Sequence, residues 1–155
     1  KDRTAANLSM QAMPGGGDPD NRRDFPGGFP ADGIDKFAPS GRTQKEREAW
    51  DYLAKLGRLR QELEPLRRGT TLDLLEEEQQ MAYARIYRDQ AVIVVINNDN
   101  KLVSVGFDFS MIKQFAVNQS FVDRLGNVAP TNIHNGWLSF TIPARSAAIL
   151  TSGTK

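Results

Sequence analysis

Hydrophobic and polar residues follow three different patterns along the 155-residue chain. Between Pro14 and Gly41, 12 of 28 residues are Gly or Pro, which disfavour the interior of helices and strands, so this segment is predicted to be a loop. From Thr43 to Leu63, apolar residues recur every three or four positions, the spacing of an amphipathic helix. After Arg67 the period falls to two, which is typical of strands. The pattern predicts a loop, one helix and then a β domain.

The predicted loop contains aromatic residues at Phe25, Phe29 and Phe37. Long loops in compact domains are uncommon and tend to be either functional or disordered. Disordered linkers are poor in aromatic residues, so the pattern favours an ordered loop held against a larger body.

The predicted helix has clear signals at both ends. Thr43 followed by Glu46 matches a capping box, in which the two side chains bond to each other's backbone amides. Pro65 is expected to stop the helix, because proline cannot continue it. The apolar face is predicted to consist of Trp50, Leu53, Leu56, Leu59 and Leu63.

Seven short strands are predicted after Arg67, the first of them before Glu76. Residues 81–87 alternate, with Tyr83 and Tyr87 on one face, and the continuous apolar run Ala91–Ile96 predicts a central strand buried on both faces. The turn-prone residues that follow it predict a hairpin to a returning strand. Weaker or alternating strands are predicted at 102–109, 121–125, 136–142 and 146–151. The predicted fold class is mainly β, an antiparallel Greek-key β-sandwich.

Composition and charge exclude several classes of protein. Twenty Lys and Arg against 19 Asp and Glu give a net charge of +1, so no strong field favours nucleic acid or an acidic membrane. The absence of cysteine excludes disulfides and thiolate chemistry. The longest apolar run, Ala91–Ile96, is far shorter than the roughly 20 residues that span a bilayer, and Lys1–Met13 lacks the apolar core of a signal peptide. Neither nucleic acid nor a membrane is an expected partner.

The densest polar segment lies inside the predicted loop and consists of Asp18, Asp20, Arg22, Arg23 and Asp24. The aspartates can start a calcium loop, but the template positions for Gly and Glu hold Arg23 and Phe29, so this interpretation is weak. Internal Asp–Arg ion pairs that fix the loop are a second interpretation. In a third, Asp18 and Arg22 bind the hydroxyls of a sugar, which suit a carboxylate and a guanidinium together.

Other motifs have plainer explanations. Gly15–Gly17 lacks the Lys and Ser or Thr that complete a phosphate-binding loop. His134 is the single histidine and has no second His or Cys with which to bind a metal or activate a nucleophile. Glu76–Glu78 lies between two predicted strands and is expected to form an exposed hairpin tip.

Aromatic residues of the β section and the carboxylates of the chain offer two further kinds of sugar chemistry, stacking and hydrolysis. Four aromatics of the β section can form a stacking platform, although core and surface packing account for them without such a role: Tyr83, Tyr87, Trp137 and Phe140. Glycoside hydrolysis requires two carboxylates on either side of the bond, but the acids of the helix are expected to face solvent and those of the loop stand beside arginines. No catalytic residue, metal or cofactor is therefore predicted.

One segment of the predicted loop carries a more specific signal than the motifs above. The string Gly17–Phe29, GDPDNRRDFPGGF, closely resembles the segment after the eighth barrel strand of α-amylase-family glycoside hydrolases, particularly the cyclomaltodextrinase and neopullulanase group. The resemblance covers about residues 14–150. It continues in order through Lys36–Phe37, Gly41–Thr43, the predicted helix, Pro65–Gly69, Tyr83–Asn98 and Ile142–Leu150.

The resemblance implies roles for two loop residues. In that family an Asp-Pro-x-Asn-Arg motif places an aspartate and an arginine against a glucose unit on the non-reducing side of the scissile bond, and these match Asp18 and Arg22. The family's catalytic carboxylates lie on earlier barrel strands, which have no counterpart here. Lys1–Met13 does not show the usual end of the preceding strand, so the chain is expected to begin just after it.

The resemblance also implies a domain organisation and a function. Residues 1–65 would be the end of a catalytic (β/α)8 barrel and residues 66–155 the C-terminal β-sandwich domain. The parent enzyme would be a retaining glycosidase acting on α-glucosidic bonds of maltooligosaccharides, cyclodextrins or starch-type glucans. Its expected partners are an α-glucan oligosaccharide and the missing barrel, and the chain alone is expected to be inactive.

The alternative is a free-standing carbohydrate-binding or structural β-sandwich module without enzymatic activity. Such a module does not need an apolar helix face directed at a missing partner. Trp50 and Leu53 therefore favour the enzyme fragment.

Overall fold

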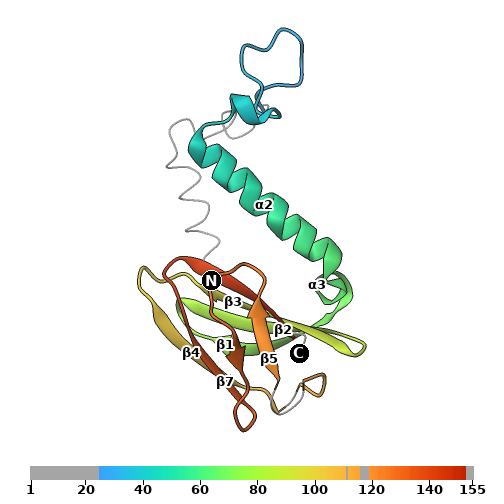
Figure 1. Cartoon of the computed structure of the whole chain (residues 1–155), viewed down its shortest axis with the longest axis vertical. Helices are drawn as coiled ribbons and strands as arrows, with labels where there is room; N and C mark the ends of the chain where they lie inside the picture. The colour runs from blue at the N-terminus through green and yellow to red at the C-terminus, as the bar shows by residue number, and fades with distance from the viewer. Residues whose placement is uncertain (1–24, 111, 116–118, 153–155) are drawn as a thin grey trace. The chain divides into compact units, whose positions relative to one another are not determined.

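The computed structural model describes residues 25–110, 112–115 and 119–152. The predicted order of loop, helix and strands is confirmed (Figure 1). The chain forms two compact units, one ending at Leu53 and the other starting at Ala54, so that their boundary falls inside a helix. Among the described residues, no helix has the length and hydrophobicity needed to cross a membrane.

The N-terminal unit begins with a loop that folds back on itself. The Lys36 amide donates to the Pro26 carbonyl at 2.9 Å and closes the loop. A short 3-10 helix, η2 (Pro39–Gly41), then leads into the long helix. Gly41 is required there, because a Cβ atom at this position would lie 1.8 Å from the carbonyl oxygen of Asp35.

The predicted helix is present as α2 (Gln44–Glu62) and is followed at once by α3 (Glu64–Arg68). As expected, the helix ends before Pro65, but a new helix follows at once and Pro65 lies in the first turn of α3. Proline is tolerated in a first turn, where its missing N–H has no intrahelical acceptor. Leu63, with extended backbone angles, is the residue that separates the two helices.

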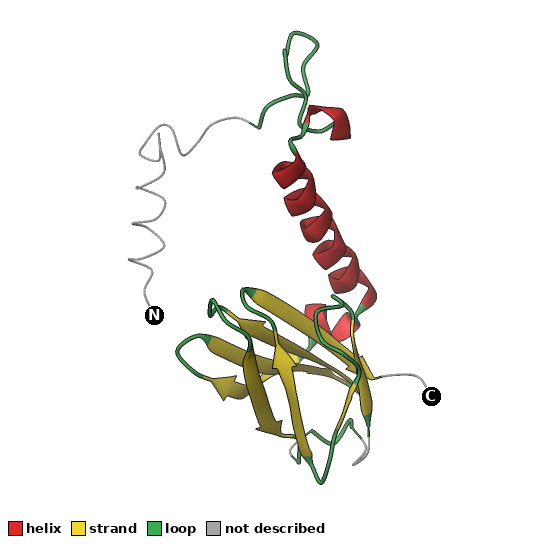
Figure 2. Cartoon of the chain, turned by 60° about the vertical axis from the view of Figure 1, so that its left-hand side comes forward, coloured by secondary structure: helices red, strands yellow, loops and turns green. Residues whose placement is uncertain are grey.

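The β section forms two antiparallel sheets, which confirms the predicted mainly-β sandwich (Figure 2). A six-stranded sheet has the order β1-β2-β3-β8-β5-β6, and β4 pairs with β7 in the second sheet. The strands are β1 (Thr70–Glu76), β2 (Gln80–Tyr87), β3 (Gln90–Asn97), β4 (Val103–Asp108), β5 (Ser120–Asp123), β6 (Thr131–Asn132), β7 (Trp137–Ile142) and β8 (Ser146–Ser152). The sequence pattern missed β6, which has only two residues.

The predicted hairpin between β3 and the following strand is wrong. β3 pairs with β2 and β8, so both of its edges are occupied, and β4 crosses to the other sheet. Asn97 holds this corner. Its side-chain amide, 1% exposed, donates to the carbonyls of Lys101 at 3.0 Å and Pro143 at 2.8 Å, so it joins the end of β3 to the segment before β8.

The main core lies between the inner faces of the two sheets. Small residues on the large sheet face bulky residues on and after β4 and β7, which lets the two layers interdigitate. The small residues are Ala82, Ala84, Ala91 and Ala148, and the phenylalanines that face them are Phe107, Phe109, Phe115 and Phe140. Phe121 joins the same cluster from β5 of the large sheet. Within this cluster Phe115 and Phe121 make an edge-on contact with ring centroids 4.8 Å apart.

The outer face of the large sheet is covered by the C-terminal part of α2. Leu59 is 5% exposed and packs with Val92 of β3 and Ile149 of β8. Two polar contacts hold the same segment: the Lys55 ammonium donates to the Leu125 carbonyl at 2.9 Å, and Arg124 pairs with Glu62 at 2.8 Å. As predicted, β3 is therefore buried on both faces.

Asp123, at the end of β5, organises the turn that follows it. This residue is 8% exposed, and its carboxylate accepts four backbone N–H groups at 2.7 to 3.1 Å, those of Leu125, Asn127, Val128 and Ile149. The Asp123 side chain thus replaces the regular backbone hydrogen bonds between strands where the chain leaves the sheet. The same four donors would be left without an acceptor if the carboxylate were removed.

Replacing this carboxylate should destabilise the sandwich. We expect Asp123→Ala to lower the free energy of unfolding by about 2–4 kcal/mol, because buried donors without acceptors are costly. Urea denaturation measures the change. Asp89→Ala, at an exposed turn, is the matched control and should stay within about 0.5 kcal/mol of wild type. Equal losses in the two variants would contradict the role of Asp123.

Candidate functional site

The two predicted sugar-contacting residues, Asp18 and Arg22, lie outside the described residues, as do Asp20 and Asp24. The structure describes the second half of the same loop, from Phe25, and the start of α2 that follows it. This region, residues 25–53, is the candidate site. It shows how the second half of the loop is held.

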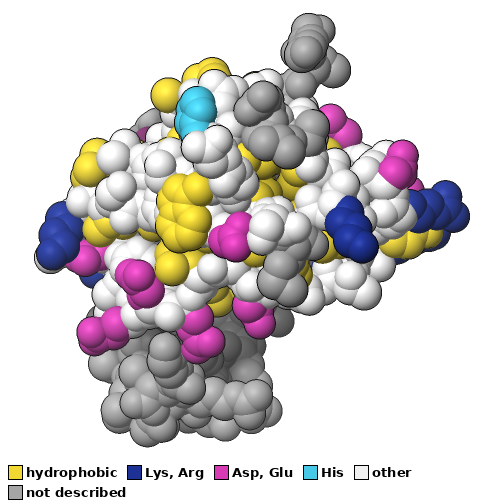
Figure 3. Space-filling model, turned by 90° about the horizontal axis from the view of Figure 1, so that it is seen from below, with side chains coloured by type: hydrophobic (Ala, Val, Ile, Leu, Met, Phe, Trp, Pro, Cys, Tyr) yellow, Lys and Arg dark blue, Asp and Glu magenta, His cyan; other side chains and the backbone are white. Residues whose placement is uncertain are grey.

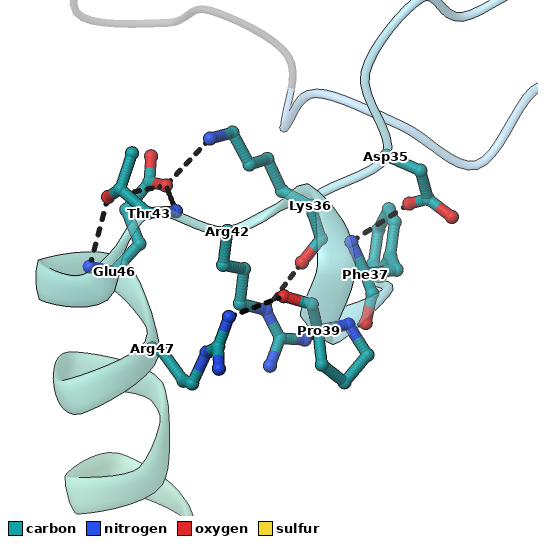
Figure 4. Close-up of polar contacts among 8 residues, drawn as sticks. All are labelled: Asp35, Lys36, Phe37, Pro39, Arg42, Thr43, Glu46 and Arg47. Carbon is teal, nitrogen blue, oxygen red and sulfur yellow. Dashed lines mark hydrogen bonds and ion pairs between the residues drawn. The ribbon is translucent and has the colours of Figure 1, made fainter.

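Arg42 makes the main contacts that hold the loop together. The residue is only 9% exposed, and its guanidinium donates to the Lys36 carbonyl at 2.7 Å and to the Phe37 carbonyl at 2.6 Å (Figure 4). The guanidinium also stacks on Trp50, 3.5 Å from the ring centroid. A planar guanidinium can bond and stack at the same time, whereas a lysine ammonium cannot reproduce this geometry. Arg42 therefore ties the loop to the first turns of α2.

The predicted capping box is confirmed and extended by a lysine. The Thr43 amide and hydroxyl both donate to Glu46 Oε2, at 2.7 and 2.9 Å, and the Glu46 amide donates to Thr43 Oγ1 at 3.4 Å. The Lys36 ammonium donates to the same Oε2 atom at 2.6 Å (Figure 4). These bonds favour the ionised carboxylate and lower the pKa of Glu46 from 4.5 to about 2, with the Lys36 bond as the largest cause.

Apolar side chains beside this network leave a shallow hollow. Phe25 packs on Phe37 with centroids 4.8 Å apart and lies 6.4 Å from Trp50. The hollow has a volume of about 270 Å³, and its apolar lining comes from Phe25, Pro26, Ala49, Trp50 and Leu53. Trp50 remains 41% exposed and Leu53 67% exposed.

The charged residues of the hollow already have partners. Lys36 and Glu46 are paired with each other, and Arg42 is committed to backbone carbonyls. Over the described part of the chain, no group of three or more His, Asp or Glu side chains could hold a metal ion. The region is therefore a fixed loop with an exposed apolar face at Trp50 and Leu53.

The remaining candidates are spread over the sandwich. His134 is exposed beside β7, and Glu77 and Glu78 are exposed between β1 and β2, as expected. The four aromatics do not form one platform: Phe140 packs against the core, Tyr83 and Tyr87 are partly buried on β2, and Trp137 is 50% exposed on β7. Sequence reasoning singled out neither Arg42 nor Lys36 as an organising residue, and the available signal was a basic residue directly before a capping box.

The fold is that of the C-terminal β-sandwich of α-amylase-family glycoside hydrolases, with a preceding helix and loop. No model of a known protein family matches the sequence. Among solved structures, the chain is similar to the α-amylase of Geobacillus thermoleovorans in complex with acarbose, with 28% identity, a TM-score of 0.68 and coverage of 91% of this chain and 27% of that one.

Two further structures agree with this comparison. The α-amylase of an Anoxybacillus shares 27% identity with a TM-score of 0.67, and the match covers 96% of this chain and 28% of that chain. A debranching enzyme of Nostoc punctiforme, at 23% identity and a TM-score of 0.57, matches 77% of this chain and 25% of that chain and supports the fold alone.

These comparisons support a glycosidase-derived domain from the α-amylase family. The chain spans little more than a quarter of the length of the first two structures, 27% and 28%. They do not separate the cyclomaltodextrinase and neopullulanase group from other amylases.

The Glu46 network gives a testable pH dependence. Because the pKa of Glu46 is about 2 in the folded chain and 4.5 ordinarily, its contribution to stability is complete above pH 4.5 and is lost as the pH falls towards 2. An NMR titration of the Glu46 side-chain carbon should give a midpoint near 2. Lys36→Met should raise that midpoint, since it removes the largest cause. A wild-type midpoint near 4.5 would show that the network does not form in solution.

Proposed function

We propose that the chain is the C-terminal part of a retaining α-amylase-family glycoside hydrolase of the cyclomaltodextrinase or neopullulanase type. The enzyme would hydrolyse α-glucosidic bonds of maltooligosaccharides, cyclodextrins or starch-type glucans. Its nucleophile and acid/base carboxylates would belong to a barrel encoded upstream of Lys1. This chain would contribute residues 1–65 to the barrel's last loop and helix, and residues 66–155 as a stabilising sandwich.

The observation that carries the proposal is the asymmetry of the structural match. The similarity extends over 91% of this chain, loop and helix included, but over only 27% of the Geobacillus amylase. A separate sandwich module would be expected to match from the first strand onwards. Instead, the match includes residues that have no role in closing the sandwich core. Acarbose in the Geobacillus complex supports an α-glucan as the ligand class.

The helix α2 supports the same proposal. Its C-terminal part is buried on the sandwich through Leu59, whereas Trp50 and Leu53 in the N-terminal unit are exposed. An exposed apolar face of this kind usually marks an interface. The missing barrel is the partner that we assign to it. This face weighs against a free-standing carbohydrate-binding module, the alternative function.

The loop residues Asp18 and Arg22 would complete a sugar subsite. The loop's second half is fixed by Arg42 and by the Lys36–Glu46 pair, so its first half would start from an anchored position. A carboxylate and a guanidinium would hydrogen-bond the hydroxyls of one glucose unit. Neither residue would take part in bond cleavage.

Substituting these residues in the complete enzyme tests the subsite. Asp18→Ala or Arg22→Ala should lower kcat/KM on maltotriose by about 10- to 100-fold, the loss of one or two charged hydrogen bonds. Glu77→Ala and Arg67→Ala, both exposed, are charge-matched controls and should leave kcat/KM unchanged. The 155-residue chain alone should show no turnover. Wild-type kinetics in both loop variants would contradict the subsite, and an upstream sequence without a barrel would contradict the whole proposal.

A second test addresses the exposed helix face. In the complete enzyme Leu53→Ala should destabilise by about 2–4 kcal/mol, because the proposed barrel would bury that side chain. In the 155-residue chain, where Leu53 is 67% exposed, the change should stay within about 0.5 kcal/mol. Leu102→Ala, 61% exposed on the sandwich, is the control and should be neutral in both proteins. Denaturant unfolding measures all four values, and a neutral Leu53→Ala in the complete enzyme would refute burial by the barrel.

A further inference from the structure

The outer face of the β4–β7 sheet carries one exposed tryptophan among small and polar residues. The strand register places Asp108 opposite Trp137, Gly106 opposite Ser139 and Ser104 opposite Thr141. The intervening residues of both strands point into the core, so these six form the outward side, which we call the Trp137 face. Trp137 is its one large apolar residue, and every neighbour is a hydroxyl, a glycine or a carboxylate.

Gly106 holds the indole against the strands. A Cβ atom on Gly106 would lie 2.8 Å from Nε1 of Trp137 and 3.2 Å from both Cε2 and Cζ2, so the ring extends across the space above the glycine. Trp137 is nevertheless 50% exposed. Any other residue at position 106 would displace the ring. The indole is therefore supported on one side by backbone and open to solvent on the other.

A charged acceptor stands beside the ring. Asp108 accepts from the Ser110 amide at 2.8 Å through Oδ1 and from the Ser110 hydroxyl at 2.9 Å through Oδ2. These two bonds, the amide first, lower the pKa of Asp108 and keep it ionised. A carboxylate has about four acceptor positions, so two bonds leave it able to accept from a ligand. Ser104, Ser139 and Thr141 add exposed hydroxyls along the same face.

We propose that the Trp137 face binds an α-glucan chain, with a glucose ring stacked on the indole and its hydroxyls bonded by Asp108 and the neighbouring Ser and Thr side chains. The inference rests on the proposed function, which supplies the class of sugar. A pyranose ring presents an apolar C–H face to an aromatic ring and a rim of hydroxyls to polar groups, and such sites combine aromatic surface with a few placed polar groups.

A protein partner fits this face less well. Stable protein interfaces bury an apolar centre made from several side chains and more than about 1,000 Å² in total. On the outward side of β4 and β7, Trp137 has no apolar neighbour among the paired residues.

Figure 3 shows a face of the molecule that carries the single histidine, in cyan, where exposed hydrophobic side chains stand next to acidic ones. His134 exchanges two backbone hydrogen bonds with Trp137, both 2.9 Å.

Maltoheptaose is the probe that tests this site on the 155-residue chain. The chain has two tryptophans, so Trp50→Phe leaves Trp137 as the only indole reporter. Titration should produce a saturable change in its fluorescence, and electrophoresis through soluble starch should retard the chain. Trp137→Ala should weaken starch retardation by about tenfold or more, since it removes the stacking surface. Asp108→Asn should weaken it less.

Two glycine-to-alanine variants test the site without removing the tryptophan. Gly106→Ala retains Trp137 but pushes the ring off the strands, and it should weaken binding about as much as Trp137→Ala. Gly57→Ala on α2, where an added Cβ meets nothing within 4 Å, is the matched control and should bind as wild type. Wild-type affinity in both Trp137→Ala and Gly106→Ala would overturn the site.

Failure of this inference can be told apart from failure of the proposed function. A complete enzyme that cleaves α-glucans, together with a chain that binds no maltoheptaose, would overturn this inference alone. A chain that binds maltoheptaose through Trp137 but has no barrel encoded upstream would overturn the proposed function alone. Equal affinity for cellohexaose and maltohexaose would also overturn the inference, because the site would then lack selectivity for α-linked chains.

Discussion

Burial of β3 on both faces is the constraint on which the C-terminal unit depends. Its inner face meets the phenylalanine-rich core, and its outer face meets Leu59 of α2. Because both edges are also paired, β3 has neither a free edge nor a free face to offer. The next strand must cross to the other sheet, and the buried amide of Asn97 supports that corner. The two-layer arrangement, and with it the separate β4–β7 surface, follows from this one strand.

Residues 25–53, the described part of the N-terminal unit, are held together mainly by charged side chains. Arg42 satisfies two loop carbonyls while it stacks on Trp50, and Glu46 joins the helix cap to Lys36. This network fixes the backbone between Phe25 and Thr43 without enclosing the aromatic side chains. Such a segment is suited to a role at the edge of a larger body, where a partner surface supplies the missing apolar contacts.

Local patterns predicted the elements well, but not their partners. Capping residues and leucine spacing predicted α2 to within one residue at each end, because these signals act within a few turns. For the same reason, alternation predicted the strands β2 and β7, and a continuous apolar run predicted that β3 is buried on both faces. The hairpin after β3 was wrong because strand pairing depends on contacts distant in sequence, here with β8. The roles of Asp18 and Arg22, suggested by their residue types and by the resemblance, stay predictions.

The Trp137 face illustrates the same limit at the level of a site. Tryptophan on an alternating strand was visible from sequence, as was its possible use for sugars. That Gly106, some thirty residues earlier, lies beneath its ring depends on the register of β4 against β7, which no local pattern encodes. Pro65 is a smaller case. The proline indicated the end of α2, but it did not indicate that a new helix starts around it.

The position of the unit boundary within α2 has a consequence for building hybrid enzymes. Domains are normally exchanged at flexible linkers, but the division between Leu53 and Ala54 falls in the middle of a continuous helix. A graft that began at the first strand would strip Leu56, Leu59 and Leu63 from the outer face of β3 and β8. The portable unit is therefore the sandwich together with its helix, joined in the glycine- and proline-rich segment before Thr43.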